Sequence, residues 1–125
     1  MILVDTPIWI DHLREENINL KRYLNLGLVS IHPFIIGEIA LGNLCDRKLI
    51  LRLLLQLPQV KTAKDWEVYL IIEKHQLWGT GIGYVDAHLL ASLLLTPNTQ
   101  FWTRDRKLQQ AVGKCDSIQS GPIVY

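Results

Sequence analysis

The sequence predicts an α/β fold in which a central parallel sheet has helices on both faces, a three-layer α/β/α arrangement. Short aliphatic runs such as Ile2–Val4 are typical of buried strands, and segments with helical spacing separate one run from the next. Strands that alternate with helices favour parallel pairing, because each crossover brings the chain back to the same end of the sheet. The 125 residues contain no internal repeat or linker, so we expect one domain over residues 1–125.

The predicted strands are apolar or β-branched runs between turn signals, and they cover Ile2–Val4, Leu28–Ile31, Gln100–Thr103 and part of Ser117–Val124. The predicted helices begin near a cap or a proline and end near a glycine or a proline. The first begins after Asp5 or Thr6, with Pro7 in its first turn. The others cover Ile18–Leu26, Pro33 to about Leu44, Leu49–Leu57, Ala63–Leu77, Tyr84–Leu95 and Asp105 to about Val112.

The composition is that of an ordinary globular protein, with 49% hydrophobic and 20% charged residues. The net charge of +1 is too small to indicate a nucleic-acid-binding protein, so any such contact needs a local patch. Cys45 and Cys115 match no zinc or redox motif. No signal peptide and no apolar run of about 20 residues is present, so we expect a cytoplasmic protein without membrane contact.

Four acidic residues stand either at the carboxyl end of a predicted strand or on an apolar face of a predicted helix. Asp5 and Asp105 follow predicted strands, and ligands of parallel sheets bind at the carboxyl ends of the strands. Glu38 lies among apolar residues in PFIIGEIALGNL, so we expect a helix that is buried nearly all round, where an ionised carboxylate costs several kcal/mol. Gly37 and Gly42 in that helix predict close backbone packing around the acid.

Asp86 shares an apolar helix face with Leu89, Leu90 and Leu93. If the four acids converge, their mutual repulsion must be compensated, and a divalent cation compensates it most simply. Carboxylate ligands without a Cys or His cluster favour Mg²⁺ or Mn²⁺ over zinc. Two other interpretations stay open. In one, the aspartates each cap a helix; in the other, Glu38 is paired with a buried arginine or with backbone groups.

Four segments in order resemble one family: ILVDTPIWIDHLR, HPFIIGEIALG, GIGYVDAHLLAS and FWTRDRKL, which together span nearly the whole chain. The chain resembles PIN-domain ribonucleases, specifically the VapC-type toxins of type II toxin–antitoxin (VapBC) systems. The resemblance implies an acidic pocket at the carboxyl edge of a parallel sheet. It also implies endonucleolytic, metal-dependent hydrolysis of RNA that leaves a 5′-phosphate and a 3′-hydroxyl.

The matching motifs place the family's four acids at Asp5, Glu38, Asp86 and Asp105, so the resemblance assigns catalysis and metal binding to these residues. It gives Thr6 and Thr103 the role of supporting hydroxyls. By placement alone, we expect the cationic residues that flank Asp105 to contact RNA phosphates, and these are Arg104, Arg106 and Lys107.

The resemblance also implies three partners: an RNA substrate, a cognate VapB-type antitoxin and a second copy of the chain in a homodimer. The leucine-rich segment Asp46–Leu57 is expected to pack in the core, to receive the antitoxin or to form the dimer face. A catalytically silent PIN-fold module that binds RNA or protein is the alternative function. A phosphatase or phosphoacceptor site is not favoured, because Pro7 stands where such a site needs a second aspartate.

Overall fold

The computed structural model of the chain describes residues 1–121. Within them, the strands β1 (Ile2–Val4), β2 (Val29–Ser30), β3 (Gln100–Trp102) and β4 (Gln119–Ser120) form one sheet in the order β2-β1-β3-β4. Every pairing is parallel, and the register sets Val4 opposite Trp102. Residues 122–124 of the predicted last strand lie outside the described residues.

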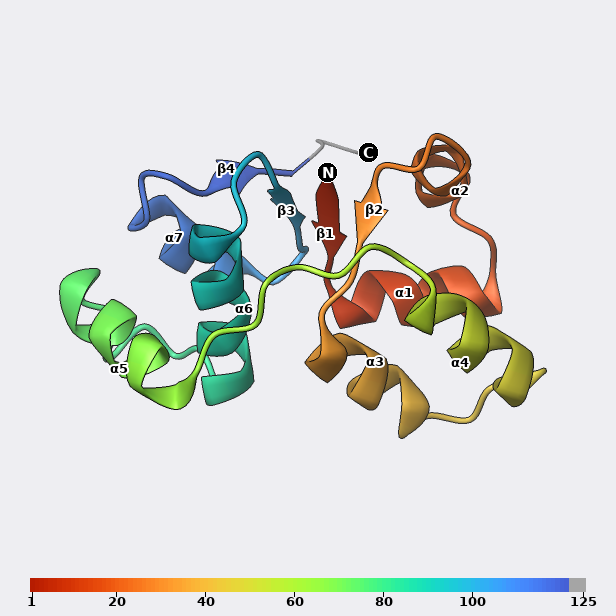
Figure 1. Ribbon diagram of the computed structural model, residues 1–125, viewed down its shortest axis with the longest axis horizontal. Coiled ribbons are helices and arrows are strands. Elements are labelled where there is room, and N and C mark those ends of the chain that lie inside the picture. The colour runs from red at the N-terminus through yellow and green to blue at the C-terminus, as the bar shows by residue number, and fades with distance from the viewer. Residues whose placement is uncertain (122–125) are drawn as a thin grey trace.

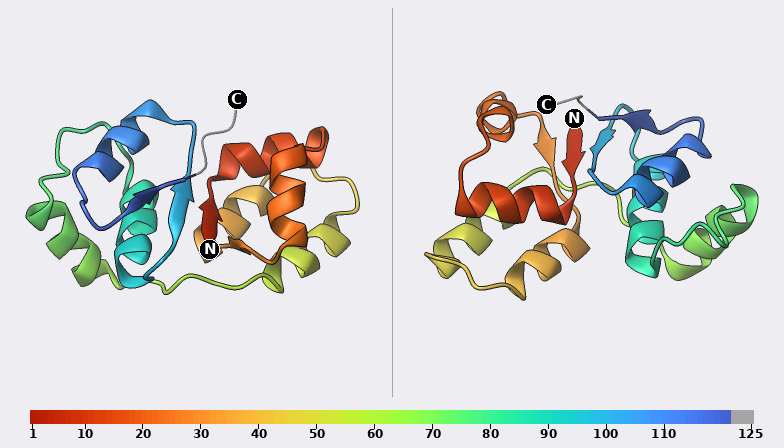
Figure 2. Two further views of the ribbon diagram at one scale, coloured as in Figure 1. Left: turned by 90° about the horizontal axis from the view of Figure 1, so that it is seen from above. Right: turned by 180° about the vertical axis from the view of Figure 1, so that it is seen from behind.

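Seven helices connect and flank these strands within residues 1–121. They are α1 (Thr6–Arg14), α2 (Ile18–Asn25), α3 (Pro33–Ala40), α4 (Arg47–Leu55), α5 (Asp65–Lys74), α6 (Tyr84–Leu95) and α7 (Arg106–Gly113). The strands run between two groups of helices, α1–α4 on one side and α5–α7 on the other (Figures 1 and 2). The predicted parallel α/β architecture is therefore confirmed.

Two helices are shorter than the sequence predicts, for local reasons. Helix α3 ends at Ala40, and Arg47 donates hydrogen bonds to the carbonyl oxygens of Ala40 and Gly42, which the ended helix leaves without a helical partner. Helix α5 ends at Lys74 because Gln76 adopts a left-handed backbone conformation with φ of 54°. Helix α6 covers the predicted range Tyr84–Leu95.

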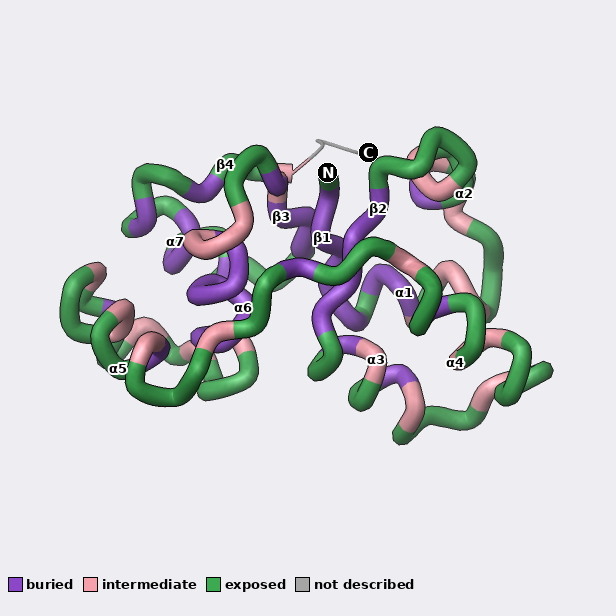
Figure 3. The backbone as a smooth tube through the Cα atoms, in the orientation of Figure 1, coloured by how far each residue is buried: buried purple, intermediate pink, exposed green. Residues whose placement is uncertain are grey.

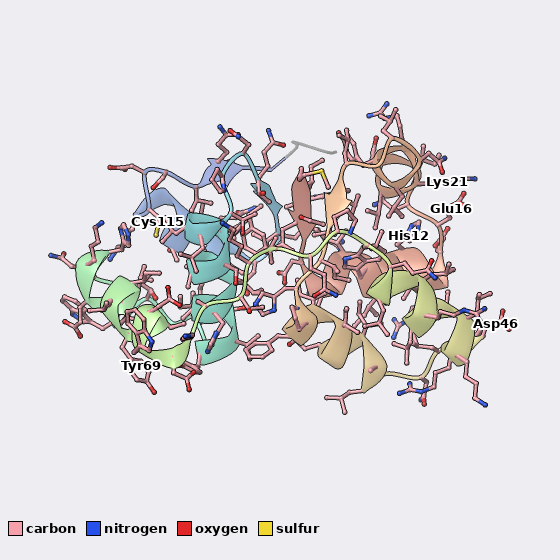
Figure 4. All side chains as sticks on the ribbon, viewed as in Figure 1. His12, Glu16, Lys21, Asp46, Tyr69 and Cys115 are labelled. Atoms are coloured by element: carbon pink, nitrogen blue, oxygen red, sulfur yellow. The ribbon has the colours of Figure 1, made fainter. Side chains whose placement is uncertain are left out.

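The core lies around β1, β2 and β3, which are buried along most of their length, whereas the edge strand β4 is exposed (Figure 3). Leu3 and Val4 are fully buried, and Ile35 of α3 and Leu90 of α6 join the same cluster. Each such side chain contributes about 1.5–3 kcal/mol through burial. Cys115 is a buried free cysteine beside α7, whereas Cys45 is exposed (Figure 4).

Among residues 1–121, no helix combines the length and the apolar character that crossing a bilayer requires.

Candidate active site

Asp5 and Thr103 meet where the two central strands end. The strands β1 and β3 are neighbours, and the backbone N–H of Asp5 donates to the Trp102 carbonyl oxygen over 2.9 Å. The Thr103 hydroxyl donates to Oδ2 of Asp5 over 2.7 Å, while the N–H of Thr6 donates to Oδ1 over 2.9 Å. Both residues are buried. The carboxylate that ends the first strand is thus also the N-cap of α1.

Glu38 reaches this site from α3 through Thr6. The Thr6 hydroxyl donates to Oε1 of Glu38 over 2.7 Å, and Thr6 itself is buried. Glu38 is exposed, which corrects the prediction of a helix buried nearly all round. Helix α3 buries Ile35 and Ile39 fully, whereas Phe34 is 41% exposed and Leu41, just after the helix, is 89% exposed.

The glycines beside Glu38 also differ from the prediction. A methyl group added at Gly37 would have no neighbour within 4 Å, and one added at Gly42 would meet only the Ile39 carbonyl oxygen at 3.4 Å. No backbone packs closely against this part of α3, so the glycines do not enclose the acid.

Asp105 and Asp86 lie at the starts of two further helices. Asp105 caps α7 by accepting from the N–H of Leu108 over 3.1 Å, and its own N–H donates to the Thr103 hydroxyl over 3.1 Å. Asp86 is half-buried near the start of α6, and its Oδ2 accepts from the N–H of Gly83 over 3.4 Å. Both aspartates therefore do cap their helices, as one open interpretation of the sequence had it.

The acids influence each other electrostatically. Burial raises the pKa of Asp5, the hydrogen bonds from Thr103 and Thr6 lower it, and the charges of Glu38 and Asp105 raise it further. Burial also raises the pKa of Asp86, against the Gly83 hydrogen bond, and the charges of Asp5 and Asp105 add to the rise.

The carboxylate oxygens of the four acids are ligands that suit a hard divalent cation, although they do not yet surround a single point. One oxygen each of Glu38, Asp86 and Asp105 accepts no hydrogen bond from the described part of the chain. All these donors are carboxylate oxygens, which Mg²⁺ and Mn²⁺ prefer. Within residues 1–121, no three His, Cys, Asp or Glu side chains already surround a common point as metal ligands.

The cationic residues near Asp105 differ in their surroundings. Arg104 forms an ion pair with Asp11 of α1 over 2.6 Å, and both side chains are more than half exposed. Lys107 lies along the loop before α6, where a methyl group added at Gly81 would come within 2.9 Å of its Cδ. Arg106 is exposed at the first position of α7.

Comparison with known proteins identifies the family. No family model matches the chain. Ribonuclease VapC32 of Mycobacterium tuberculosis, from strain CDC 1551 / Oshkosh and from strain ATCC 25618 / H37Rv, is 41% identical over 111 residues, which cover 89% of this chain and 90% of the relative. The chain belongs to the VapC ribonuclease family. The resemblance seen in the sequence is therefore confirmed, and the parallel sheet between helices agrees with the three-layer PIN fold.

In this VapC-family chain, one contact between α3 and α6 had no signal in the sequence. The Phe34 ring lies 4.9 Å from the rings of both His32 and His88, centre to centre. His32 accepts from the N–H of Phe34 at Nδ1, and burial, with a smaller effect of His88, lowers its pKa to about 4. A neutral His32 and the Phe34 ring therefore fix the helix that carries Glu38 against the helix that carries Asp86.

Proposed function

We propose that this VapC-family protein is the toxin of a type II toxin–antitoxin pair and acts as an Mg²⁺- or Mn²⁺-dependent endoribonuclease in the cytoplasm. The observation that carries the proposal is the hydrogen-bonded series Glu38–Thr6–Asp5–Thr103–Asp105, which links the acid on α3 to the acids that follow β1 and β3. The raised pKa values of Asp5 and Asp86 support a site whose negative charge calls for a cation.

In this proposal, Asp5, Glu38, Asp86 and Asp105 hold the cation. When bound, the cation would supply the Lewis acidity that activates water and stabilises charge on the scissile phosphate. Thr103 and the Thr6 backbone orient Asp5, and their hydrogen bonds favour its carboxylate form against the effect of burial on its pKa. The Thr6 hydroxyl holds the exposed Glu38 beside Asp5. The second carboxylate oxygen of Glu38 can then accept a proton from water or bind the ion.

The substrate would be an RNA strand that enters over the start of α7. Lys107 and Arg106 are exposed there and are suited to bind phosphate oxygens. Arg104 is already paired with Asp11, so we assign it a weaker share of the phosphate contacts. We expect products that carry a 5′-phosphate and a 3′-hydroxyl.

The experiment is a cleavage assay on single-stranded RNA with the purified protein, in Mg²⁺, in Mn²⁺ and in EDTA. We expect cleavage only with a divalent cation, and none from Asp5→Asn or Asp86→Asn. The matched control is Asp116→Asn, which changes an exposed acid before β4 and should cut normally. Equal cleavage in EDTA would contradict the metal mechanism. Binding of RNA without cleavage in any metal would favour the catalytically silent module.

Exposed apolar side chains support the two protein partners. Leu49 and Leu53, one helical turn apart on α4, are 44% and 49% exposed and provide an apolar face for the antitoxin's C-terminal segment. Leu41, which follows α3 as its C-cap, is 89% exposed, and this supports a homodimer through that end of the helix. Leu41→Arg should then convert a dimer to a monomer in light scattering, while a wild-type monomer would exclude this interface.

A further inference from the structure

An apolar cleft of about 220 Å³ lies between α5 and the loop that leads into α6. Ile72 of α5 and Leu77 form part of its wall, and Trp78 and Tyr84 line it with aromatic rings. Along the loop, Gly79, Gly81 and Gly83 line the cleft beside Ile82, so part of this wall is backbone. Binding sites for drug-sized molecules enclose about 300–1,000 Å³, so this cleft suits a single planar ring system.

The cleft adjoins the acidic site through the backbone. Gly83 lines the cleft, and its N–H donates to Oδ2 of Asp86 over 3.4 Å. Tyr84 is the first residue of α6, two positions before Asp86. A group held in the cleft is therefore next to a residue of the proposed catalytic site.

Lys107 of α7 and Lys114, the residue that follows this helix, give the loop a positive flank. The Lys107 side chain lies over Gly81, where a methyl group would come within 3.3 Å of its Nζ. Gly81 has φ of +84°, a conformation that favours glycine, and the missing side chain lets Lys107 lie there. Lys114 donates from Nζ to the Gln76 carbonyl oxygen over 3.0 Å at the other end of the loop. Positive charge beside an aromatic cleft complements a base with its phosphodiester.

The aromatic walls are held in place before any ligand binds. The Tyr84 hydroxyl donates to Asp65 over 2.8 Å, and its ring packs edge-on against His88 with ring centres 4.7 Å apart. The Thr80 hydroxyl donates to the Leu77 carbonyl oxygen over 2.6 Å and closes the turn that contains Trp78. Trp78 remains 59% exposed, so much of its surface is free to contact a partner.

We propose that this cleft binds one unpaired base of the RNA, stacked against Trp78 and Tyr84, with a neighbouring phosphate on Lys107. This inference rests on the proposed ribonuclease function and adds a subsite that selects unpaired RNA next to the cleavage position. Single-stranded RNA is recognised in this way because splayed bases stack on aromatic side chains, whereas bases in a duplex do not.

The test is fluorescence anisotropy with a fluorescein-labelled single-stranded ten-nucleotide RNA in EDTA, which prevents cleavage if the ribonuclease depends on metal. We expect the wild type to bind this strand more tightly than the same strand in a duplex. Trp78→Ala should weaken binding by about tenfold, and Trp78→Phe should restore most of it. Lys107→Gln should weaken binding to all sequences and lower the slope of log affinity against log salt by about one.

The matched control is Trp66→Ala, because Trp66 on α5 is also 59% exposed but does not line the cleft. It should bind RNA as the wild type does, and melting temperatures should confirm that all variants fold. The proposal is overturned if Trp78→Ala binds normally, if Trp66→Ala loses as much affinity, or if the wild type does not bind the single strand. It is equally overturned if Trp78→Ala only dissociates an oligomer of this chain.

Failure of the subsite and failure of the nuclease have different signatures. Cleavage in Mg²⁺ with unchanged RNA affinity in Trp78→Ala and Lys107→Gln would refute the subsite and leave the ribonuclease intact. Binding that depends on Trp78 in a protein that never cleaves RNA would refute the ribonuclease and support the subsite.

Discussion

The Thr103 hydroxyl donates a hydrogen bond to Oδ2 of Asp5 over 2.7 Å, across 98 positions of the chain. The same hydroxyl accepts the N–H of Asp105, so one buried side chain connects the acids that follow β1 and β3. Parallel pairing of these strands brings the two residues together, and the hydroxyl then fixes their relative position. Three of our predictions concern the residues around this contact.

Thr103→Val should lower both stability and activity. It removes a donor to a buried carboxylate and an acceptor for a backbone N–H, which should cost about 1–3 kcal/mol in the free energy of unfolding. Because the lost bond favours the charged form of Asp5, the acid limb of the pH–rate profile should move to higher pH. Thr103→Ser should behave as the wild type does in denaturant melts and in the profile. An unshifted acid limb in Thr103→Val would show that Asp5 does not depend on this hydroxyl.

Thr6→Val should separate activity from stability. Glu38 is exposed, so its carboxylate turns to water when the Thr6 hydroxyl is removed, and the melting temperature should change little. Cleavage should fall by about 10–100-fold, the usual cost of losing a residue that orients a metal ligand. Thr6→Ser, which keeps the hydroxyl, should restore cleavage. Full activity in Thr6→Val would remove Thr6 from the positioning role.

Asp5→Asn should stabilise the metal-free protein at neutral pH. The folded state raises the pKa of Asp5 by burial, so it holds the proton more tightly than the unfolded chain. The contribution of Asp5 therefore favours folding below its unfolded pKa and is lost as the pH rises through the folded pKa. Asparagine stays neutral, keeps the oxygen that caps Thr6 and offers an N–H to Thr103.

The measurement for this prediction is thermal melting in EDTA from pH 4 to pH 8. The gain in melting temperature of Asp5→Asn over the wild type should grow as the pH rises, whereas Asp116→Asn should show no such trend. A lower melting temperature for Asp5→Asn at neutral pH would mean that the charged Asp5 is well compensated without a metal ion.

The sequence predicted the parts of the fold that local patterns determine. The aliphatic run Ile2–Val4 and the acid that follows it locate β1 and Asp5, because buried strands are apolar and parallel strands end at a common edge. Proline, glycine and capping residues located most helices to within a few residues. The positions of Asp5 and Asp105 at this edge follow from these two patterns.

The surroundings of the side chains were not predictable in the same way. Helix α3 is apolar on two sides, and sequence alone does not distinguish a buried side from an exposed one, so Glu38 was expected in the core. The ion pair of Arg104 with Asp11 joins residues 93 positions apart, and no local pattern indicates it. Such contacts depend on the packing of α1 and α7 onto the sheet.

The most direct test of the central claim is a titration of the protein with Mn²⁺, followed by the electron paramagnetic resonance signal of the free ion. We predict saturable binding of one or two ions per chain, with at least tenfold weaker binding in Asp5→Asn and unchanged binding in Asp116→Asn. A wild type that binds no Mn²⁺, or an Asp5→Asn variant that binds it equally well, would contradict a metal centre built on these acids.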